Sequence, residues 1–396
     1  MKRCQLSDLV IPVNTWNPGK SDPEESFQYI DLSAVDQETK SIVGARNVGC
    51  SDAPSRARQL VKAGDILVST VRPNLNGVAK VPDGLNGATA STGFCVVRPK
   101  PELLDGSYLF HWVKSDEFIG EMVKEATGAS YPAVSDRIVL ASRIPLSPLP
   151  EQRRIAAILD QADALRAKRR ETLALLDELQ RGIFIEMFCS AESSSWPVVT
   201  IESIAEQEPG SIRTGPFGSQ LLHSEFVDSG IAVLGIDNAV SNNFRWVERR
   251  FITDEKYRQL KRYTVRPGDV LITIMGTCGR CAVVPDDIPL AINTKHLCCI
   301  SLNRDLCLPE FLHAYFLRHP VAQEYLLRTA KGAIMSGLNM GLIKSLPVAL
   351  PPLERQRLFV SRCQAIQQLR SPHAAALTEL DSLFVSLQHR AFRGEL

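Results

Sequence analysis

The chain has 396 residues, of which 44% are hydrophobic and 22% charged, and its formal net charge is +1. This length exceeds what one hydrophobic core usually organises, so we expect two or three domains. No uninterrupted run of about eighteen apolar residues occurs, and the chain does not begin with a long apolar stretch and a small-residue cleavage site. These features argue against a membrane span and a signal peptide. They predict a cytoplasmic protein whose ten cysteines are reduced.

The first predicted domain covers residues 1–147. Short apolar runs, ILVSTV at 66–71 and GFCVVRP at 93–99, are separated by turn-forming sequences such as RPN and PDG. This pattern is typical of short strands joined by turns. A helical stretch begins near Tyr108 and ends near Gly128, since glycine enters the left-handed region without a side-chain penalty. The mixture of strands and helices predicts an α+β domain.

Residues 148–190 are predicted to form a helical spacer. Its apolar residues follow a heptad pattern that Arg169 and Thr172 interrupt near the middle. One core position of the heptad holds Ile155, Ala162, Leu176 and Ile183, and the other holds Ile158, Leu165 and Leu179. A helix from Glu151 to Ile185 would be about 50 Å long, and its apolar stripe needs a partner.

The second half of the chain repeats the first with an offset of 204 residues. Gly64-Asp65 returns as Gly268-Asp269, and Gln152 returns as Gln356. Few other positions match, which indicates a duplicated scaffold whose surfaces have diverged. We therefore expect a second α+β domain at 191–350 and recognition of a two-part target.

A second helical spacer is predicted at 351–396. Its apolar stripe consists of Leu377, Leu380, Phe384, Leu387 and Ala391. The two spacers together predict an intramolecular coiled coil, and the alternative is that each helix packs only on its own domain. The copies differ at Ser371-Pro372, where we expect the helix to break and restart with Ser371 as its cap. A kink at the proline is the alternative.

A local excess of basic residues lies between Arg245 and Arg266. It comprises Arg245, Arg249, Arg250, Lys256, Arg258, Lys261, Arg262 and Arg266, against Glu248, Asp254 and Glu255. A nucleic-acid surface needs only such a local excess. An ordinary solvated face is the alternative interpretation.

Common catalytic signatures do not occur in the sequence. There is no GxxxxGK[ST] phosphate loop, no GxGxxG dinucleotide motif and no motif that begins with Asn-Pro-Pro or Asp-Pro-Pro, as in amino-methyltransferases. The two Pro-Asp pairs are not followed by the acidic-x-Lys sequence of a metal-dependent nuclease. Cys278 and Cys281 have the spacing of zinc ligands, but their repeat equivalents are Asn74 and Gly77. We therefore expect no metal site on this chain.

Several ordered motifs carry a resemblance to a known family. The first half contains APSRARQLVKAGDILVSTVRPNLNGVAKVP, ASTGFCVVRP and PLPEQRRIAAILDQADAL, and the second contains RTGPFGSQL, YTVRPGDVLITIMGTCGRCAVVP and GLNMGLIKSLPVALPPLERQR. Together they resemble the specificity subunit of type I restriction-modification enzymes, over essentially the whole chain. The ordered double occurrence is more specific than any single motif.

The resemblance implies a fold and a set of partners. The fold would be two pseudo-repeated α+β target recognition domains linked by long helices that form an antiparallel intramolecular coiled coil. The chain would be a non-catalytic reader of a bipartite, asymmetric DNA sequence, and lengthening the first helical spacer by one turn would lengthen the gap between the half-sites. Two modification subunits would supply S-adenosylmethionine-dependent adenine methylation, and restriction subunits would bring ATP-driven, magnesium-dependent activity.

Candidate DNA contacts lie beside the repeated Gly-Asp strand. They are Arg56, Arg58, Ser69, Arg72, Asn74 and Tyr131 in the first domain, and Arg213, Ser219, Thr273, Thr277 and Arg280 in the second. The loops at Ser130-Tyr131 and Met335-Ser336 occupy matching places. Arginine suits guanine and asparagine suits adenine, so Arg72 and Asn74 are candidates for base reading. The alternative is that both residues only shape a turn.

Partner docking is assigned to the coiled-coil residues together with Glu151, Gln152 and Gln356. Two other classes of function stay open. One is a free-standing two-headed DNA-binding regulator, and the other is a structural coiled-coil adaptor without DNA contact.

Overall fold

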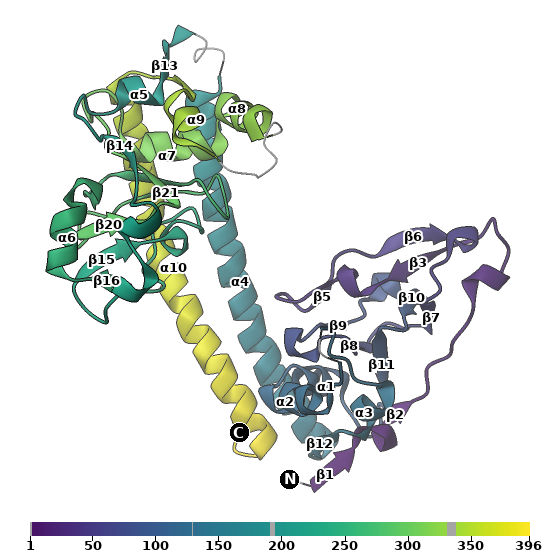
Figure 1. The fold of residues 1–396 in the computed structure, drawn as a ribbon. Helices are drawn as coiled ribbons and strands as arrows, with labels where there is room; N and C mark the ends of the chain where they lie inside the picture. The colour runs from purple at the N-terminus through teal and green to yellow at the C-terminus, as the bar shows by residue number, and fades with distance from the viewer. Residues whose placement is uncertain (1, 129, 191–194, 331–337) are drawn as a thin grey trace. The chain divides into compact units, whose positions relative to one another are not determined.

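A computed structural model describes residues 2–128, 130–190, 195–330 and 338–396, and the chain divides into two compact units (Figure 1). Unit 1 comprises Met1–Thr172 and His373–Leu396, and unit 2 comprises Leu173–Pro372. Two long helices, α4 (Leu149–Phe188) and α10 (Leu353–Arg393), contribute one part to each unit.

Unit 1 contains two four-stranded sheets and two strand pairs. The sheet orders are β6-β3-β10-β7 and β2-β11-β8-β9, β1 pairs with β12, and β4 pairs with β5. The pairing of β3 with β10 is parallel, and the other pairings in these sheets are antiparallel. The strands are β1 (Lys2–Gln5), β2 (Val10–Ile11), β3 (Ser26–Ile30), β4 (Val35–Asp36), β5 (Ser41–Ile42), β6 (Arg46–Gly49), β7 (Ala57–Leu60), β8 (Ile66–Ser69), β9 (Val78–Lys80), β10 (Thr89–Ser91), β11 (Phe94–Pro99) and β12 (Arg143–Leu146). The shorter helices are α1 (Gly106–Val113), α2 (Asp116–Glu125) and α3 (Asp136–Ala141).

Unit 2 repeats the two four-stranded sheets and the β1–β12 pair of unit 1, whereas the β4–β5 pair has no counterpart among the described strands of unit 2. Its sheet orders are β16-β15-β20-β17 and β14-β21-β18-β19, β13 pairs with β22, and β15 is parallel to β20. The strands are β13 (Val198–Thr200), β14 (Ile212–Thr214), β15 (Ile231–Leu234), β16 (Phe251–Ile252), β17 (Thr264–Val265), β18 (Val270–Thr273), β19 (Cys281–Val283), β20 (Ala291–Asn293), β21 (Leu297–Ile300) and β22 (Pro347–Ala349). The shorter helices are α5 (Ile201–Ile204), α6 (Asp254–Leu260), α7 (Pro309–Arg318), α8 (Pro320–Ala330) and α9 (Met340–Lys344). The duplication predicted from the 204-residue offset is therefore confirmed.

The repeated Gly-Asp strand lies between two hydrophobic cores in each unit. In β8, Ile66 and Val68 pack into the core that contains α1 to α3, whereas Leu67 packs into the core of the other sheet. In β18, Leu271 likewise faces away from its neighbours Val270 and Ile272. Successive strand residues point to opposite faces, so a strand covered on both faces is apolar throughout.

Within each unit, the two long helices run antiparallel. In unit 1, Arg166 Nε donates to Asp381 Oδ1 over 2.6 Å, and its guanidinium lies over the Phe384 ring. In unit 2, Arg370 Nε donates to Asp177 Oδ1 over 3.1 Å, and the Phe359 ring packs against Phe184 and Phe188. The predicted α+β class with two repeated domains and paired antiparallel helices is thus confirmed.

The predicted break at Ser371-Pro372 is wrong. Helix α10 continues without interruption from Leu353 to Arg393, with Pro372 inside it. Proline has no backbone N–H, so the carbonyl of Gln368 loses its helical hydrogen bond. Pro372 and Gln368 are both exposed, so the Gln368 carbonyl lies on the solvent side of the helix and can accept a hydrogen bond from water. Packing of the long segments on either side of the proline outweighs one lost hydrogen bond.

Replacing Pro372 with alanine is expected to stabilise the chain by about 2 kcal/mol. The substitution restores one helical hydrogen bond and removes the proline ring clash, and greater freedom of the unfolded chain offsets part of the gain. Urea unfolding of the full chain measures the difference. Ser371→Ala is the matched control, with an expected change within about 0.5 kcal/mol. If Pro372→Ala had the same free energy of unfolding as the parent chain, Pro372 would not destabilise the helix through the lost hydrogen bond.

Candidate nucleic-acid interface

Backbone hydrogen bonds join two candidate loops of unit 1. One loop follows β8 and contains Arg72, and the other contains Tyr131. The Arg72 N–H donates to the Pro132 carbonyl over 2.7 Å, and Val71 pairs with Ala133 in an isolated antiparallel bridge. The two loops therefore present one continuous surface.

Arg72 and Tyr131 form an exposed pair on this surface. Arg72 has a φ of 51° and caps the short 3-10 helix Pro73–Leu75. Its guanidinium carbon lies 4.5 Å from the centre of the Tyr131 ring, and Tyr131 is 68% exposed. A cation–π contact of this kind orients the guanidinium while leaving donors free. Such a pair can donate two parallel hydrogen bonds to guanine or stack on a base.

The other candidates in unit 1 separate into two groups. Arg56 and Asn74 are exposed. Arg58 is half-buried and donates to the Ala57 carbonyl over 2.7 Å, and the half-buried Ser69 donates to the Val71 carbonyl over 2.9 Å. Arg58 and Ser69 thus serve the local fold, whereas Arg56 and Asn74 face solvent.

In unit 2, the loop between β18 and β19 exposes Thr277 and Arg280. Thr273 is fully buried beneath them. Its hydroxyl donates to the Thr277 carbonyl and accepts from the Arg280 N–H over 2.9 Å. Thr273 therefore shapes the loop that presents the other two residues. Ser219 is exposed on the separate short helix Gly218–Gln220.

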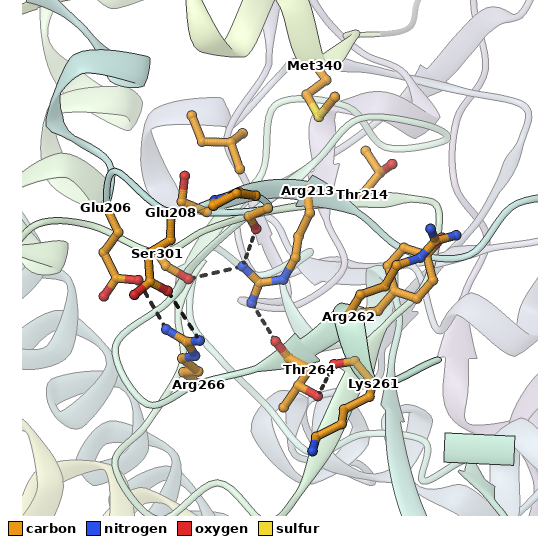
Figure 2. Close-up of a pocket in the computed structure, with 15 residues that line it drawn as sticks. Glu206, Glu208, Arg213, Thr214, Lys261, Arg262, Thr264, Arg266, Ser301 and Met340 are labelled. Carbon is orange, nitrogen blue, oxygen red and sulfur yellow. Dashed lines mark hydrogen bonds and ion pairs between the residues drawn. The ribbon is translucent and has the colours of Figure 1, made fainter. Parts of the chain in front are cut away.

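Arg213 lines the cleft shown in Figure 2, and its guanidinium is hydrogen-bonded within unit 2. It donates to Ser301 Oγ over 3.0 Å, to the Thr264 carbonyl over 2.5 Å and to Asp269 Oδ2 over 2.8 Å (Figure 2 draws the first two). Asp269 is the aspartate of the repeated Gly-Asp motif and is buried. The motif thus provides a buried counter-ion for an arginine.

Unit 1 makes the equivalent ion pair with a different strand. Arg98 on β11 donates to both carboxylate oxygens of Asp65, over 2.8 and 2.7 Å. Hydrogen bonding to Asp65 raises the pKa of Arg98. The Gly-Asp motif is therefore a structural feature that both units share, and the exposed candidates are displayed around it.

Gln152 and Gln356 occupy equivalent places at the start of the long helices. Both are fully buried. Gln152 accepts from the Asp105 N–H over 2.8 Å and donates to the carbonyls of Leu103 and Ser147. Gln356 accepts from the Leu308 N–H over 2.8 Å and donates to the carbonyls of Leu306 and Pro351. Each glutamine thus fastens its helix to its own domain, and its amide is not presented to a partner.

The predicted coiled-coil residues differ in burial. Those that are buried or half-buried are Ile155, Ile158, Ala162, Leu176, Ile183, Leu377, Leu380, Phe384, Leu387 and Ala391, and the half-buried Glu151 pairs with Arg154. Leu165 is 47% exposed and Leu179 is 51% exposed. Leu369 and Leu383 are also about half exposed on α10. The paired helices therefore leave apolar side chains on their surface in both units.

Sequence reasoning missed Asn242 and His313 beside the unit 2 loop. Asn242 has a φ of 58°, and its Oδ1 accepts from the Cys281 N–H over 3.1 Å. His313 Nε2 lies 2.9 Å from the Asn242 carbonyl oxygen, and burial lowers the pKa of His313. The turn-forming sequence SNN was the only sign of this contact in the sequence. The Met335-Ser336 candidates lie outside the described residues.

Cys281 and Cys298 both belong to the hydrophobic core of unit 2. Burial raises the pKa of the Cys298 thiol to about 12. Across residues 2–128, 130–190, 195–330 and 338–396, no group of three or more His, Cys, Asp or Glu side chains is arranged to hold a metal ion.

Among the helices that the structure describes, none combines the length and apolar character needed to cross a bilayer.

Comparisons with known proteins agree with this geometry. The family described as "Type I restriction modification DNA specificity domain" matches residues 56–175 and 225–371. The chain belongs to this family. It is therefore a DNA-binding specificity subunit of the type I restriction-modification class, and its two α+β domains are target recognition domains.

Individual relatives show the same class. The specificity subunit of the type I restriction enzyme EcoBI from Escherichia coli is 24% identical over 326 residues, covering 76% of this chain and 68% of the relative. A solved chain from work on complex assembly and conformational transition of the type I R-M system is 27% identical, with a TM-score of 0.55 and coverage of 100% of this chain and 98% of that one. The type I restriction-modification S subunit from M. genitalium, at 14% identity, a TM-score of 0.58 and coverage of 99% and 96%, shares the fold.

Proposed function

We propose that this specificity subunit reads a bipartite, asymmetric DNA sequence, with one half-site for each target recognition domain. The observation that carries the proposal is the duplicated scaffold with unlike loops. The 204-residue offset aligns Arg72 with Gly276 and Tyr131 with Met335, so the sequence of unit 2 does not repeat this pair, although the strands beside Arg72 and Gly276 are equivalent. Two equivalent scaffolds that expose different side chains suit two different half-sites.

The chain is proposed to be non-catalytic and to act in the cytoplasm with partner subunits. Two modification subunits would bind S-adenosylmethionine and methylate adenine, and restriction subunits would bind ATP and magnesium. The exposed leucines of the paired helices support this assignment, because apolar side chains at the centre of a contact contribute much of its affinity. In unit 1, a groove on these helices is lined by four apolar residues, Leu165, Ala376, Leu380 and Leu383, together with Arg169 and Glu379.

Mapping of methylated adenines in genomic DNA, with and without the gene for this chain, tests the proposal. We expect one bipartite methylated motif to disappear when the gene is removed and to return when it is restored. Unchanged methylation in a strain that expresses the modification subunit would contradict the proposal. A free-standing two-headed regulator would bind DNA without co-purifying methyltransferase subunits, so co-purification separates it from the specificity subunit.

A further inference from the structure

An open cleft in unit 2 is strongly basic. It lies between α4, α7, α10 and the loop that contains Arg280. Four arginines line it, Arg181, Arg280, Arg318 and Arg370, and Asp177 is the only carboxylate among its lining residues. The remaining lining residues are mostly amides, such as Asn243, Gln323 and Gln367.

The positive charge of this cleft is not neutralised by unit 2. Asp177 pairs with Arg370, over 3.1 Å. Within the described part of the chain, Arg181, Arg280 and Arg318 form no ion pair with a carboxylate. Arg318 is half-buried, burial lowers the pKa of its guanidinium, and its hydrogen bond to the Gln180 carbonyl is long, at 3.4 Å.

The equivalent junction in unit 1 is neutralised from within. Lys114 Nζ donates to Asp163 Oδ2 over 2.6 Å, and Arg166 donates to the other oxygen of the same carboxylate over 2.6 Å. Beside them, His111 Nε2 lies 2.7 Å from Asp160 Oδ1. Two aspartates on α4 thus face the basic residues of this junction.

The repeat shows what unit 2 has lost. The 204-residue offset aligns Lys114 with Arg318 and Arg166 with Arg370, so both cations are kept. The same offset aligns Asp160 with Gln364 and Asp163 with Gln367. Unit 2 therefore keeps these two cations but has the Gln367 amide where unit 1 has the Asp163 carboxylate. At the second pair, unit 2 has Tyr315 and Gln364 where unit 1 has His111 and Asp160, so both charged partners are replaced there. A partly buried cation without a counter-ion destabilises a fold, which favours a functional reason for this difference.

We propose that the cleft of Arg181, Arg280 and Arg318 binds phosphates of the DNA backbone. This inference rests on the proposed function. It adds to it a site at which the second domain contacts the duplex independently of the base sequence. Guanidinium groups match phosphate oxygens with parallel hydrogen bonds, and the neighbouring amides are further donors. The lining is poor in the aromatic and apolar anchors on which protein contacts usually depend. Arg280 also lies on a loop with an exposed tip, so its side chain can contact the DNA backbone without entering a groove of the duplex.

The test uses the full chain with the subunits that co-purify with it. The variant Arg181→Gln/Arg280→Gln removes two exposed charges, and its affinity is measured for a duplex with the methylated motif and for a scrambled duplex, over a range of salt concentrations. We expect both Kd values to rise by the same factor, about tenfold or more, while the methylated motif stays the same. The slope of log Kd against log salt should fall by about 0.9 for each phosphate that the variant no longer neutralises. Arg362→Gln, an exposed charge on α10 outside the cleft, should change neither quantity.

A second variant, Gln367→Asp, gives unit 2 the carboxylate that unit 1 has. We expect Tm to stay the same or rise, because the aspartate neutralises Arg318, while binding of both duplexes weakens. Opposite effects on stability and binding cannot arise from misfolding.

The outcomes that overturn the inference are distinct. Unchanged Kd and salt slope in both variants would exclude phosphate binding, and unchanged Kd with loss of a co-purified subunit would assign the cleft to an acidic protein surface instead. If the parent protein showed no preference for the motif, the proposed function would fail, but binding of the scrambled duplex would still report on the cleft.

Discussion

Replacing Gln356 with leucine is expected to destabilise unit 2 by about 3 to 5 kcal/mol. The side chain is fully buried and satisfies one backbone N–H and two backbone carbonyls. Leucine fills a similar volume but leaves all three groups without a partner, and each buried unsatisfied group costs about 1–3 kcal/mol. Because these groups belong to the segment before α7 and the segment before α10, the loss also loosens the attachment of the domain to its helix.

Urea unfolding of the full chain measures this effect, with Gln364→Leu as the matched control. Gln364 is an exposed glutamine on the same helix, and its substitution should change the free energy of unfolding by less than about 0.5 kcal/mol. Gln152→Leu should reproduce the loss in unit 1, since Gln152 makes the same three bonds. A loss in Gln356→Leu no larger than that of the control would show that water replaces the amide and that the glutamine is not needed to join helix and domain.

The sequence contained more information about the scaffold than about the surface. Gly64-Asp65 and Gly268-Asp269 predicted equivalent strands, and both strands occupy the same place in identical sheet orders. The repetition of Gln152 at Gln356 also pointed to a shared role. That role was predicted as partner docking, because a repeat shows that a residue matters but does not show which way its side chain points.

Pro372 illustrates a second limit. Local propensity favours a helix break at proline, but the helix segments on both sides are long enough to be held by tertiary packing. Ile366 before the proline and Phe384 after it are both buried. A propensity argument weighs only the residues near the proline and omits this packing.

The candidate DNA contacts divide for a similar reason. Arg213 and Arg72 are both arginines beside the Gly-Asp strand, yet one pairs with buried Asp269 and the other is exposed. The partner of Arg213 is 56 residues away in the sequence, and in unit 1 the equivalent aspartate takes its arginine from another strand. Sequence spacing alone therefore could not distinguish the structural arginine from the exposed one.

Replacing Arg72 with asparagine is expected to relax sequence preference in one half-site of the target. Asparagine accepts the left-handed conformation that Arg72 adopts, so the loop should keep its shape while the guanidinium and its interaction with Tyr131 are removed. If Arg72 donates two parallel bonds to a guanine, its removal costs about 1–3 kcal/mol of discrimination at that base pair, or roughly tenfold to a hundredfold in relative affinity. Competition binding with duplexes altered at each position of the methylated motif measures the preference.

The pattern of losses decides between base reading and phosphate contact at Arg72. Base reading predicts a loss of preference at one position of one half-site, with the other half-site read as before. Phosphate contact predicts equal weakening for all duplexes and a smaller dependence on salt. Arg143→Asn, which removes an exposed arginine from β12 in the same unit, should leave the preference intact. Uniform weakening in Arg72→Asn would therefore refute base reading by Arg72, and it would leave Arg56, Asn74 and Tyr131 as the candidates for reading this half-site.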